Sequence, residues 1–215
     1  MEATGMAVNQ GTKDKVAEAA IGLFMTKGYS GTSVRAIAGR AGVNVALISY
    51  YFGGKKGMLE HLINTYLEGY LKELEEASEQ VSGSFECLVA IIEAALQFQQ
   101  THHRMARLVL RELTLDSILV REVMASYYMK EKHLFRQVLE AGKEAGVFKG
   151  MRKEWAILHL RGMITMPFLH AQHIREVFHL EPSDRTFLYH YMKHVRQFVE
   201  VQICEPQPAA ASLVV

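Results

Sequence analysis

The 215-residue sequence has little of what disulfide-rich or sheet-rich proteins need. Its two cysteines, Cys87 and Cys204, lie far apart and without zinc-site spacing, so we expect reduced thiols and no metal site. Four prolines occur, two of them in the final stretch CEPQPAAASLVV. A body poor in proline and rich in Ala, Leu, Met and Glu favours helices. The composition therefore predicts an all-α protein.

Long apolar runs and enzyme motifs are also missing. Arg161 and Pro167 interrupt the run from 160 to 169, far short of the roughly 20 apolar residues of a membrane span. The N-terminal MEATGMAVNQGT has neither the basic start nor the apolar core of a secretory signal. No glycine-rich phosphate loop, nucleophile elbow or zinc signature occurs. We expect a cytoplasmic, nucleoid-associated protein with no catalytic residues and no cofactor.

The charge is unevenly distributed. Residues 1–60 hold seven Lys and Arg against four Asp and Glu, whereas residues 61–215 hold 17 against 19. This excess makes the N-terminal end the candidate for an anionic partner. Because most basic clusters are solvated faces, charge alone favours nucleic acid only weakly.

Three short helices are predicted in the first 55 residues. The first begins at the cap Thr12 and ends at Gly28; the second is capped by Thr32 and ends at Gly42; the third, Val45 to Phe52, is capped by Asn44 and ends at Gly53-Gly54. Two short helices joined by a glycine turn are typical of a DNA-binding helix-turn-helix. An ordinary pair of packed helices has the same periodicity.

The residues of this part resemble a known family. The string GTSVRAIAGRAGVNVALISYYFGGKKGMLEHL, from 31 to 62, resembles the TetR/AcrR regulators in its Gly-Thr-Ser start, Ile-Ala, Ala-Gly-Val, Tyr-Phe, Lys and Leu positions. LFMTKGY at 23–29 matches the end of the family's first helix. Ser49 departs from the pattern, which usually has tyrosine there. Backbone contact is then expected to shift to Tyr50.

The resemblance implies a TetR-like organisation. Residues 1–57, ordered from about 12, are expected to form the DNA-binding domain, 58–204 an all-helical dimerisation and regulatory domain, and 205–215 a flexible tail. It also implies a homodimer that binds double-stranded DNA at roughly palindromic sites. The stretch 111–135 resembles a branch of the family from endospore-forming bacilli, which implies a link to cell division during sporulation and a cell-division protein as partner.

Candidate DNA contacts follow from the third helix and from the matched positions. The helix is expected to read bases while Ile48 and Phe52 turn inward to Ile37 and Phe24; its base-reading candidates are Asn44, Val45, Ala46, Ser49 and Tyr50. The phosphate candidates are Thr32, Arg35, Tyr51 and Lys55, with Lys56 as an addition. Small and apolar residues dominate the reading helix, so fit and DNA shape should weigh heavily. For Tyr50 and Tyr51, packing is the alternative.

Six further helices are predicted, over 58–80, 84–101, 103–113, 116–142, 153–170 and 184–203, with breaks marked by Gly83, Gly146, Gly150, Pro167 and Pro182. The resemblance implies that the last two pair with their mates in a second subunit. Their apolar residues agree with this: Trp155, Leu158, Leu160 and Met163 on one, and Phe187, Leu188, Tyr191, Val195 and Phe198 on the other.

Two features leave the regulation open. Family members often hold a small-molecule ligand in this domain, but the histidines at 102, 103, 159, 170 and 173 are better explained as solvent-facing or capping residues. Arg104, Arg107 and Arg111 share one helix face, either as part of a salt-bridged surface or as a stripe that docks a partner. A ligand-controlled repressor and a DNA-anchored interaction protein therefore both fit the sequence.

Overall fold

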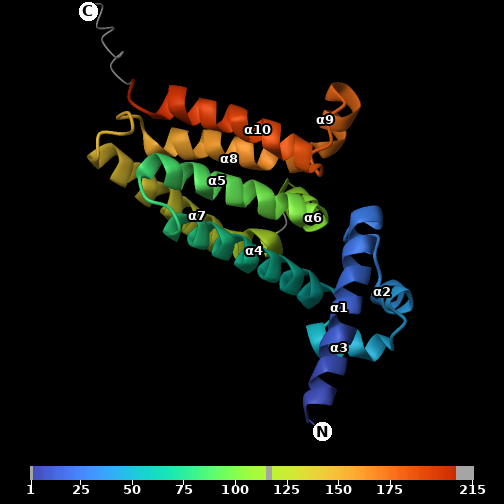
Figure 1. Ribbon diagram of the computed structural model, residues 1–215. Coiled ribbons are helices and arrows are strands. Elements are labelled where there is room, and N and C mark those ends of the chain that lie inside the picture. Colours follow the sequence, from blue (N-terminus) through green and yellow to red (C-terminus); the bar gives the residue numbers. More distant parts are fainter. Residues whose placement is uncertain (1, 115–117, 207–215) are drawn as a thin grey trace, which may run out of the picture. The chain divides into compact units, whose positions relative to one another are not determined.

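The computed structural model describes residues 2–114 and 118–206 and confirms the all-α prediction (Figure 1). Within these ranges the only β-type pairing is an isolated antiparallel bridge between Phe148 and Cys204. The chain divides into two compact units. The first unit contains residues up to Gly69 and His102–Ser126, and the second contains Tyr70–Thr101 and the residues from Tyr127 onward.

The first unit contains the predicted helix-turn-helix. It is built from α1 (Glu2–Lys27), α2 (Val34–Ala41), α3 (Val45–Phe52), the start of α4 (Lys55–Glu79), α6 (His103–Thr114) and the start of α7 (Ile118–Glu144). The predicted start of the first helix at Thr12 is wrong, because α1 already begins at Glu2. The predicted ends are confirmed: Gly28, Gly42 and Gly53 all have the left-handed backbone conformation, with φ of 74°, 68° and 68°.

Packing holds the two short helices of this unit in place. Helices of eight residues are unstable alone in water, so α2 and α3 depend on the apolar side chains that they bury. Ile37 of α2 and Ile48 of α3 are fully buried, as is Phe24 of α1. Each such side chain stabilises the unit by roughly 1.5–3 kcal/mol. The inward direction predicted for Ile48 and Phe52 is confirmed by their burial.

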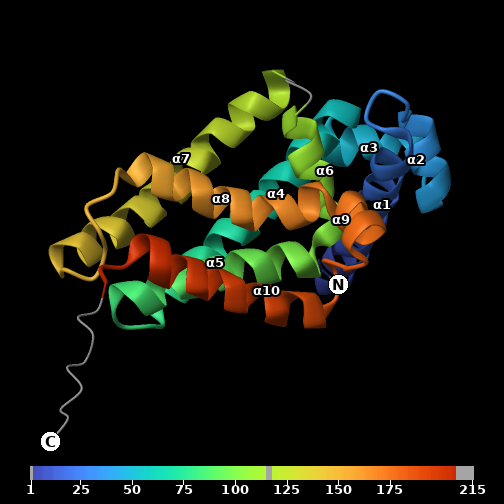
Figure 2. The ribbon, with the colours of Figure 1, turned by 90° about the horizontal axis from the view of Figure 1, so that it is seen from above.

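The second unit is a layered helical bundle. In it, α5 (Ser84–Thr101) packs on α8 (Lys153–Leu169) and on α10 (Arg185–Phe198), and the views from the side and from above show these three helices side by side (Figure 2). The short helix α9 (Ala171–Phe178) was not predicted. After α10 the chain continues in a π-helical turn, Val199–Ile203.

Pro167 does not break a helix, although the sequence pattern indicated a boundary there. It lies inside α8 and is buried. Because proline has no N–H, the carbonyl of Met163 loses its usual helical donor. The hydroxyl of Tyr191 in α10 donates to that carbonyl at 2.9 Å. Burial raises the pKa of Tyr191, which keeps this hydroxyl protonated.

A buried carboxylate connects three helices of the second unit. The side chain of Glu131 in α7 accepts a hydrogen bond from the Tyr70 hydroxyl of α4 at 2.8 Å and pairs with Arg161 of α8. The Arg161 guanidinium also lies 4.1 Å from the ring centroid of Tyr128. A buried charge is tolerated when it is paired and hydrogen-bonded in this way. The network therefore ties α4, α7 and α8 together.

Candidate nucleic-acid interface

The cap of α2 is one residue later than predicted. Ser33, not Thr32, is the N-cap, and its hydroxyl accepts from the Ala36 amide at 3.1 Å. Thr32 is 2% exposed and its hydroxyl donates to the Gly28 carbonyl at 2.8 Å. The capping role predicted for Thr32 is therefore wrong, and its buried hydroxyl is hydrogen-bonded within the chain. Ser33 and the amides that follow it lie at the exposed start of α2.

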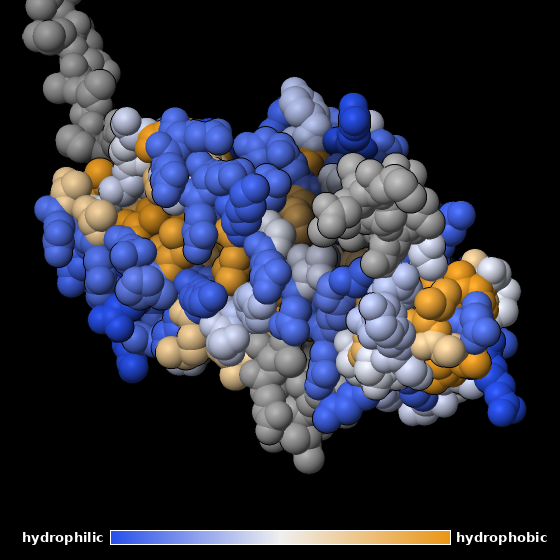
Figure 3. Space-filling model, turned by 90° about the horizontal axis from the view of Figure 1, so that it is seen from below, coloured by the Kyte–Doolittle hydropathy of each residue, from blue (hydrophilic) through white to orange (hydrophobic). Residues whose placement is uncertain are grey.

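Helix α3 separates into an outward and an inward face. Its reading face, defined here as Val45, Ala46, Ser49 and Tyr50, is exposed, with exposed fractions of 42% for Val45 and 78% for Tyr50. Figure 3 shows apolar surface on the lobe that carries α2 and α3. The predicted cap is confirmed, because Oδ1 of Asn44 accepts from the Ala46 amide at 2.9 Å. The residues predicted to read bases thus lie together on the exposed side of α3, and that role stays a prediction.

The two tyrosines of α3 have different environments. Tyr51 is half-buried, and its ring lies 5.1 Å from that of Tyr50 and 6.3 Å from that of Phe52. Tyr51 therefore takes part in packing, which was the alternative predicted for one of these two tyrosines. Tyr50 extends into solvent.

Lys55 is held by the protein itself. Its ammonium donates to the carbonyls of Tyr29 and Thr32, both at 3.0 Å, and lies 4.3 Å from the centroid of the Tyr29 ring. These contacts fasten the start of α4 to the turn between α1 and α2. Lys55 thus has a structural role that the sequence pattern did not indicate, and the phosphate contact predicted for it stays a prediction.

Other cations of the interface are available. Arg35 is exposed and, within the described residues, makes no hydrogen bond or ion pair. Lys56 is exposed and has only a long contact of 3.9 Å with Glu60. Lys13 of α1 lies over the Phe52 ring. Burial and this nearby ammonium lower the pKa of His61, so its imidazole is neutral at pH 7.

A glycine missed by the sequence interpretation, Gly57, lies in the first turn of α4, against the end of α3. A Cβ atom at Gly57 would lie 1.9 Å from the carbonyl oxygen of Phe52. Only glycine permits this close approach without a shift of the backbone. The run GGKKG at 53–57 could have indicated it. Gly57 thus fixes how directly α4 follows α3.

The arginine stripe, Arg104, Arg107 and Arg111 of α6, largely serves the first unit. Arg104 pairs with Glu18 of α1 at 3.0 Å. The Arg111 guanidinium donates to the carbonyl of Phe24 at 2.8 Å, next to the end of α1. Arg107 is half-buried and makes no ion pair within the described ranges. Arg111 is therefore engaged within the chain, the salt-bridged alternative describes Arg104, and docking by the stripe stays a prediction.

Helices α8 and α10 carry an exposed apolar face. Trp155 and Leu158 are 54% and 57% exposed, as a subunit interface needs. Three predicted members, Leu160, Leu188 and Val195, are wrong, because they are buried within the chain. Met163, Phe187, Tyr191 and Phe198 are half-buried. Met166 of α8, Tyr189 of α10 and Val201 of the π-helical turn are further exposed apolar residues.

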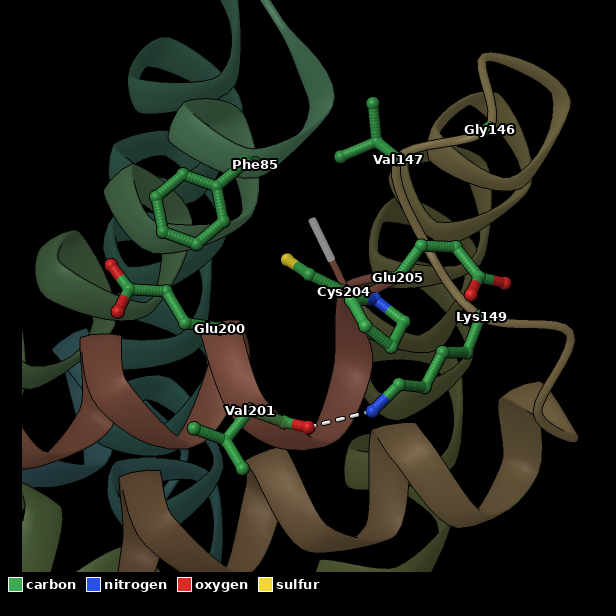
Figure 4. A pocket seen from close by; sticks show the side chains of 9 residues that line it. Phe85, Gly146, Val147, Lys149, Glu200, Val201, Cys204 and Glu205 are labelled. Carbon is green, nitrogen blue, oxygen red and sulfur yellow. Dashed lines mark hydrogen bonds between the residues drawn. The ribbon is translucent and has the colours of Figure 1, made fainter. Parts of the chain in front are cut away.

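The second unit has a groove but no metal-ligand cluster in the part of the chain that the structure describes. The groove encloses about 900 Å³ between the start of α5, the α7–α8 connection and the π-helical turn (Figure 4). Phe85 and Val147 face it together with the thiol of Cys204, whose pKa is raised by burial. Lys149 donates to the Val201 carbonyl. Of the histidines singled out in the sequence, all five are exposed.

The chain is similar to known proteins in sequence. Residues 16–62 match the family described as bacterial regulatory proteins, tetR family. The chain is 42% identical over 190 residues to the "Probable HTH-type transcriptional regulator YttP" of Bacillus subtilis (strain 168), which covers 87% of this chain and 92% of that protein.

Solved structures share the fold at lower identity. FadR of Bacillus subtilis, solved in complex with stearoyl-CoA, superposes with a TM-score of 0.73 at 18% identity, covering 88% of this chain and 98% of that chain. PfmR of Thermus thermophilus, a TetR family regulator, superposes with a TM-score of 0.72 at 22% identity, covering 86% of this chain and 96% of that chain. Within the described residues, no helix is long and apolar enough to cross a membrane.

Proposed function

The chain belongs to the TetR family of bacterial regulatory proteins, and from this premise we propose that it binds roughly palindromic DNA sites as a homodimer in the cytoplasm, on the nucleoid. The observation that carries the proposal is the reading face of α3, which is exposed on a helix whose cap and buried side are both formed. In a helix-turn-helix the second helix of the motif, here α3, enters the major groove. The DNA-binding part is proposed to be 1–57 and the regulatory part 58–204; most of the tail, 205–215, lies outside the described residues.

The phosphate contacts are proposed to come from the start of α2 and the start of α4. Ser33 and the free amides of α2 suit a phosphate oxygen, because helix N-termini attract anions. Arg35 and Lys56 add positive charge at exposed positions. The Tyr51 hydroxyl remains a candidate phosphate contact, on a ring that is half-buried. Lys55 contributes by holding the turn between α1 and α2 in position. These contacts set affinity, and the reading face sets sequence choice.

A random-sequence pool of duplexes tests this function. Retained duplexes should share an inverted repeat whose half-site centres lie about one helical turn, or a multiple of it, apart. Failure to retain any duplex at about 50 mM salt, where phosphate contacts are strong, would overturn the proposal.

The dimer is proposed to form through the exposed apolar residues of α8 and α10. Replacing Leu158 by Glu places a charge in that face and should convert the dimer into monomers that lose specific DNA binding. Met129→Glu is the matched control, since Met129 is 62% exposed on α7. Sedimentation at micromolar concentration gives the mass of each variant. A wild-type monomer, or a dimer unaffected by Leu158→Glu, contradicts this interface.

Regulation has two candidates. Small-molecule control is the alternative to a purely DNA-anchored role, and FadR, which has the same fold, was solved with stearoyl-CoA. A partner in cell division during sporulation is proposed from the resemblance of residues 111–135 to RefZ of endospore-forming bacilli. Because Arg104 and Arg111 contact α1, Arg107 is the stripe residue left for such docking. Arg107→Glu should abolish the cellular effect and leave DNA binding intact if docking operates.

A further inference from the structure

The reading face of α3 offers methyl groups and hydroxyls but no charge. Val45 and Ala46 present methyl groups in the first turn, and Ser49 and Tyr50 present hydroxyls one turn later. The helix sequence VALISYYF contains no Arg, Lys, Asp or Glu. The bidentate contact that Arg or Lys makes with guanine is therefore unavailable from the helix itself, as is the carboxylate contact with cytosine.

Asn44 is the one carboxamide at this end of the helix, and its acceptor is engaged. Oδ1 of Asn44 accepts from the Ala46 amide at 2.9 Å, with the backbone of Asn44 in the extended conformation of a cap. Reading adenine with both groups of a carboxamide requires that same oxygen to accept from N6–H of the base. The cap therefore occupies one of the two lone pairs of Oδ1 and holds this oxygen toward the backbone, so the amide N–H donors are the groups that Asn44 most readily offers to a base.

We propose that α3 selects thymine at the base pairs beneath its first turn. Thymine is the base that presents a methyl group beside an acceptor, O4, in the major groove. Val45 and Ala46 contact the methyl, and donors from Asn44, Ser49 or Tyr50 reach O4 or a neighbouring N7. Val45, Ala46 and Ser49 are thus specificity-determining residues. This inference rests on the proposed DNA-binding function and names the base class that it reads.

The size of the effect follows from burial of one methyl group. Burying a methyl-sized group is worth about 0.8 kcal/mol, and 1.4 kcal/mol corresponds to a tenfold change, so losing one thymine methyl should weaken binding about fourfold. The same loss in both half-sites of a palindrome should weaken it roughly fifteenfold, if the half-sites contribute independently.

The test uses a duplex retained from the random pool, with its thymines replaced one at a time by deoxyuridine. This replacement removes the C5 methyl and keeps every hydrogen-bonding group of the base. The affinity of wild-type protein for the duplex should fall about fourfold when the contacted thymine of either half-site is replaced. Val45→Ala, which removes two methyl groups from the contact and leaves Ala46 in place, should lose less affinity on that replacement than wild type, whereas Ser49→Ala, the matched control on the same face, should lose as much as wild type. Thermal unfolding checks that both variants fold.

The outcomes separate this inference from the function on which it rests. Loss of affinity confined to one or two thymines per half-site, and reduced in Val45→Ala but not in Ser49→Ala, supports thymine selection. If the protein binds a defined inverted repeat and its affinity changes less than twofold at every deoxyuridine replacement, thymine selection alone is overturned. Enrichment of guanine–cytosine pairs at all contacted positions overturns it as well. A protein that retains no duplex overturns the proposed function together with it.

Discussion

Helices α3 and α6 lie in the same unit and both carry side chains that a partner could contact, yet they use them differently. The reading face of α3 has no hydrogen bond or ion pair from the side chains of Val45, Ala46 and Ser49 within the described residues. On α6, Arg104 and Arg111 contact α1 of the same chain. Side chains without partners inside the protein are available for binding, whereas paired ones hold a neighbouring helix. This contrast assigns DNA recognition to α3 and the support of α1 chiefly to Arg111 of α6.

The strongest way to test the contrast is to remove Arg111. Its guanidinium donates to the Phe24 carbonyl near the end of α1, where the helix dipole favours a cation. Arg111→Ala should lower the free energy of unfolding by about 2 kcal/mol, because hydrogen bonds to charged groups contribute about that much. Arg107→Ala, on the same helix, is the control and should change it by less than about 0.5 kcal/mol. Equal stability of the two variants in urea unfolding would remove Arg111 from its supporting role.

Lys55 and Lys56 sharpen the contrast next, because they are neighbours with different tasks. Lys55→Ala should destabilise the protein by about 1–2 kcal/mol through loss of its two carbonyl contacts, and leave the salt slope of DNA binding unchanged. Lys56→Ala should leave stability unchanged and reduce the slope of log K against log salt by about 0.9 per subunit, the value for one phosphate contact. Titrations at several salt concentrations give both slopes. A reduced slope for Lys55→Ala would restore Lys55 as a phosphate clamp.

Arg104 gives the smallest expected effect. Its pair with Glu18 joins side chains that are 46% and 67% exposed, and exposed ion pairs of this kind contribute about 0.5 kcal/mol or less. The free energy of unfolding of Arg104→Ala should therefore lie within about 0.5 kcal/mol of the wild-type value, and the difference should vanish at high salt. A loss above about 1.5 kcal/mol in the same urea experiment would show that this pair, too, holds α6 on α1.

Local patterns could be predicted from the sequence because their causes lie within a few residues. The left-handed glycines at 28, 42 and 53, the cap at Asn44 and the inward direction of Ile48 all follow from turn chemistry and helical periodicity. The cap of α2 was predicted one position too early, at Thr32 instead of Ser33, because both residue types cap helices and only the burial of Thr32 separates them.

The missed features depend on residues that are distant in the sequence. Arg111 meets a carbonyl 87 positions away, and Pro167 is accommodated by the hydroxyl of Tyr191 in another helix. Leu160, Leu188 and Val195 could not be told from interface residues, because a subunit interface and the core of one chain are both apolar. A pattern of residue types shows which side chains need burial, and tertiary packing decides where they find it.

The most direct test of recognition by α3 compares the DNA sites selected by wild-type protein and by Ala46→Arg. Ala46 is exposed, so the replacement should leave folding intact while it adds a guanidinium to the reading face. Both proteins should select an inverted repeat of the same spacing, and the variant should change the preferred base, toward guanine, at the same position of each half-site. Identical preferred bases for both proteins would contradict recognition by this face of α3.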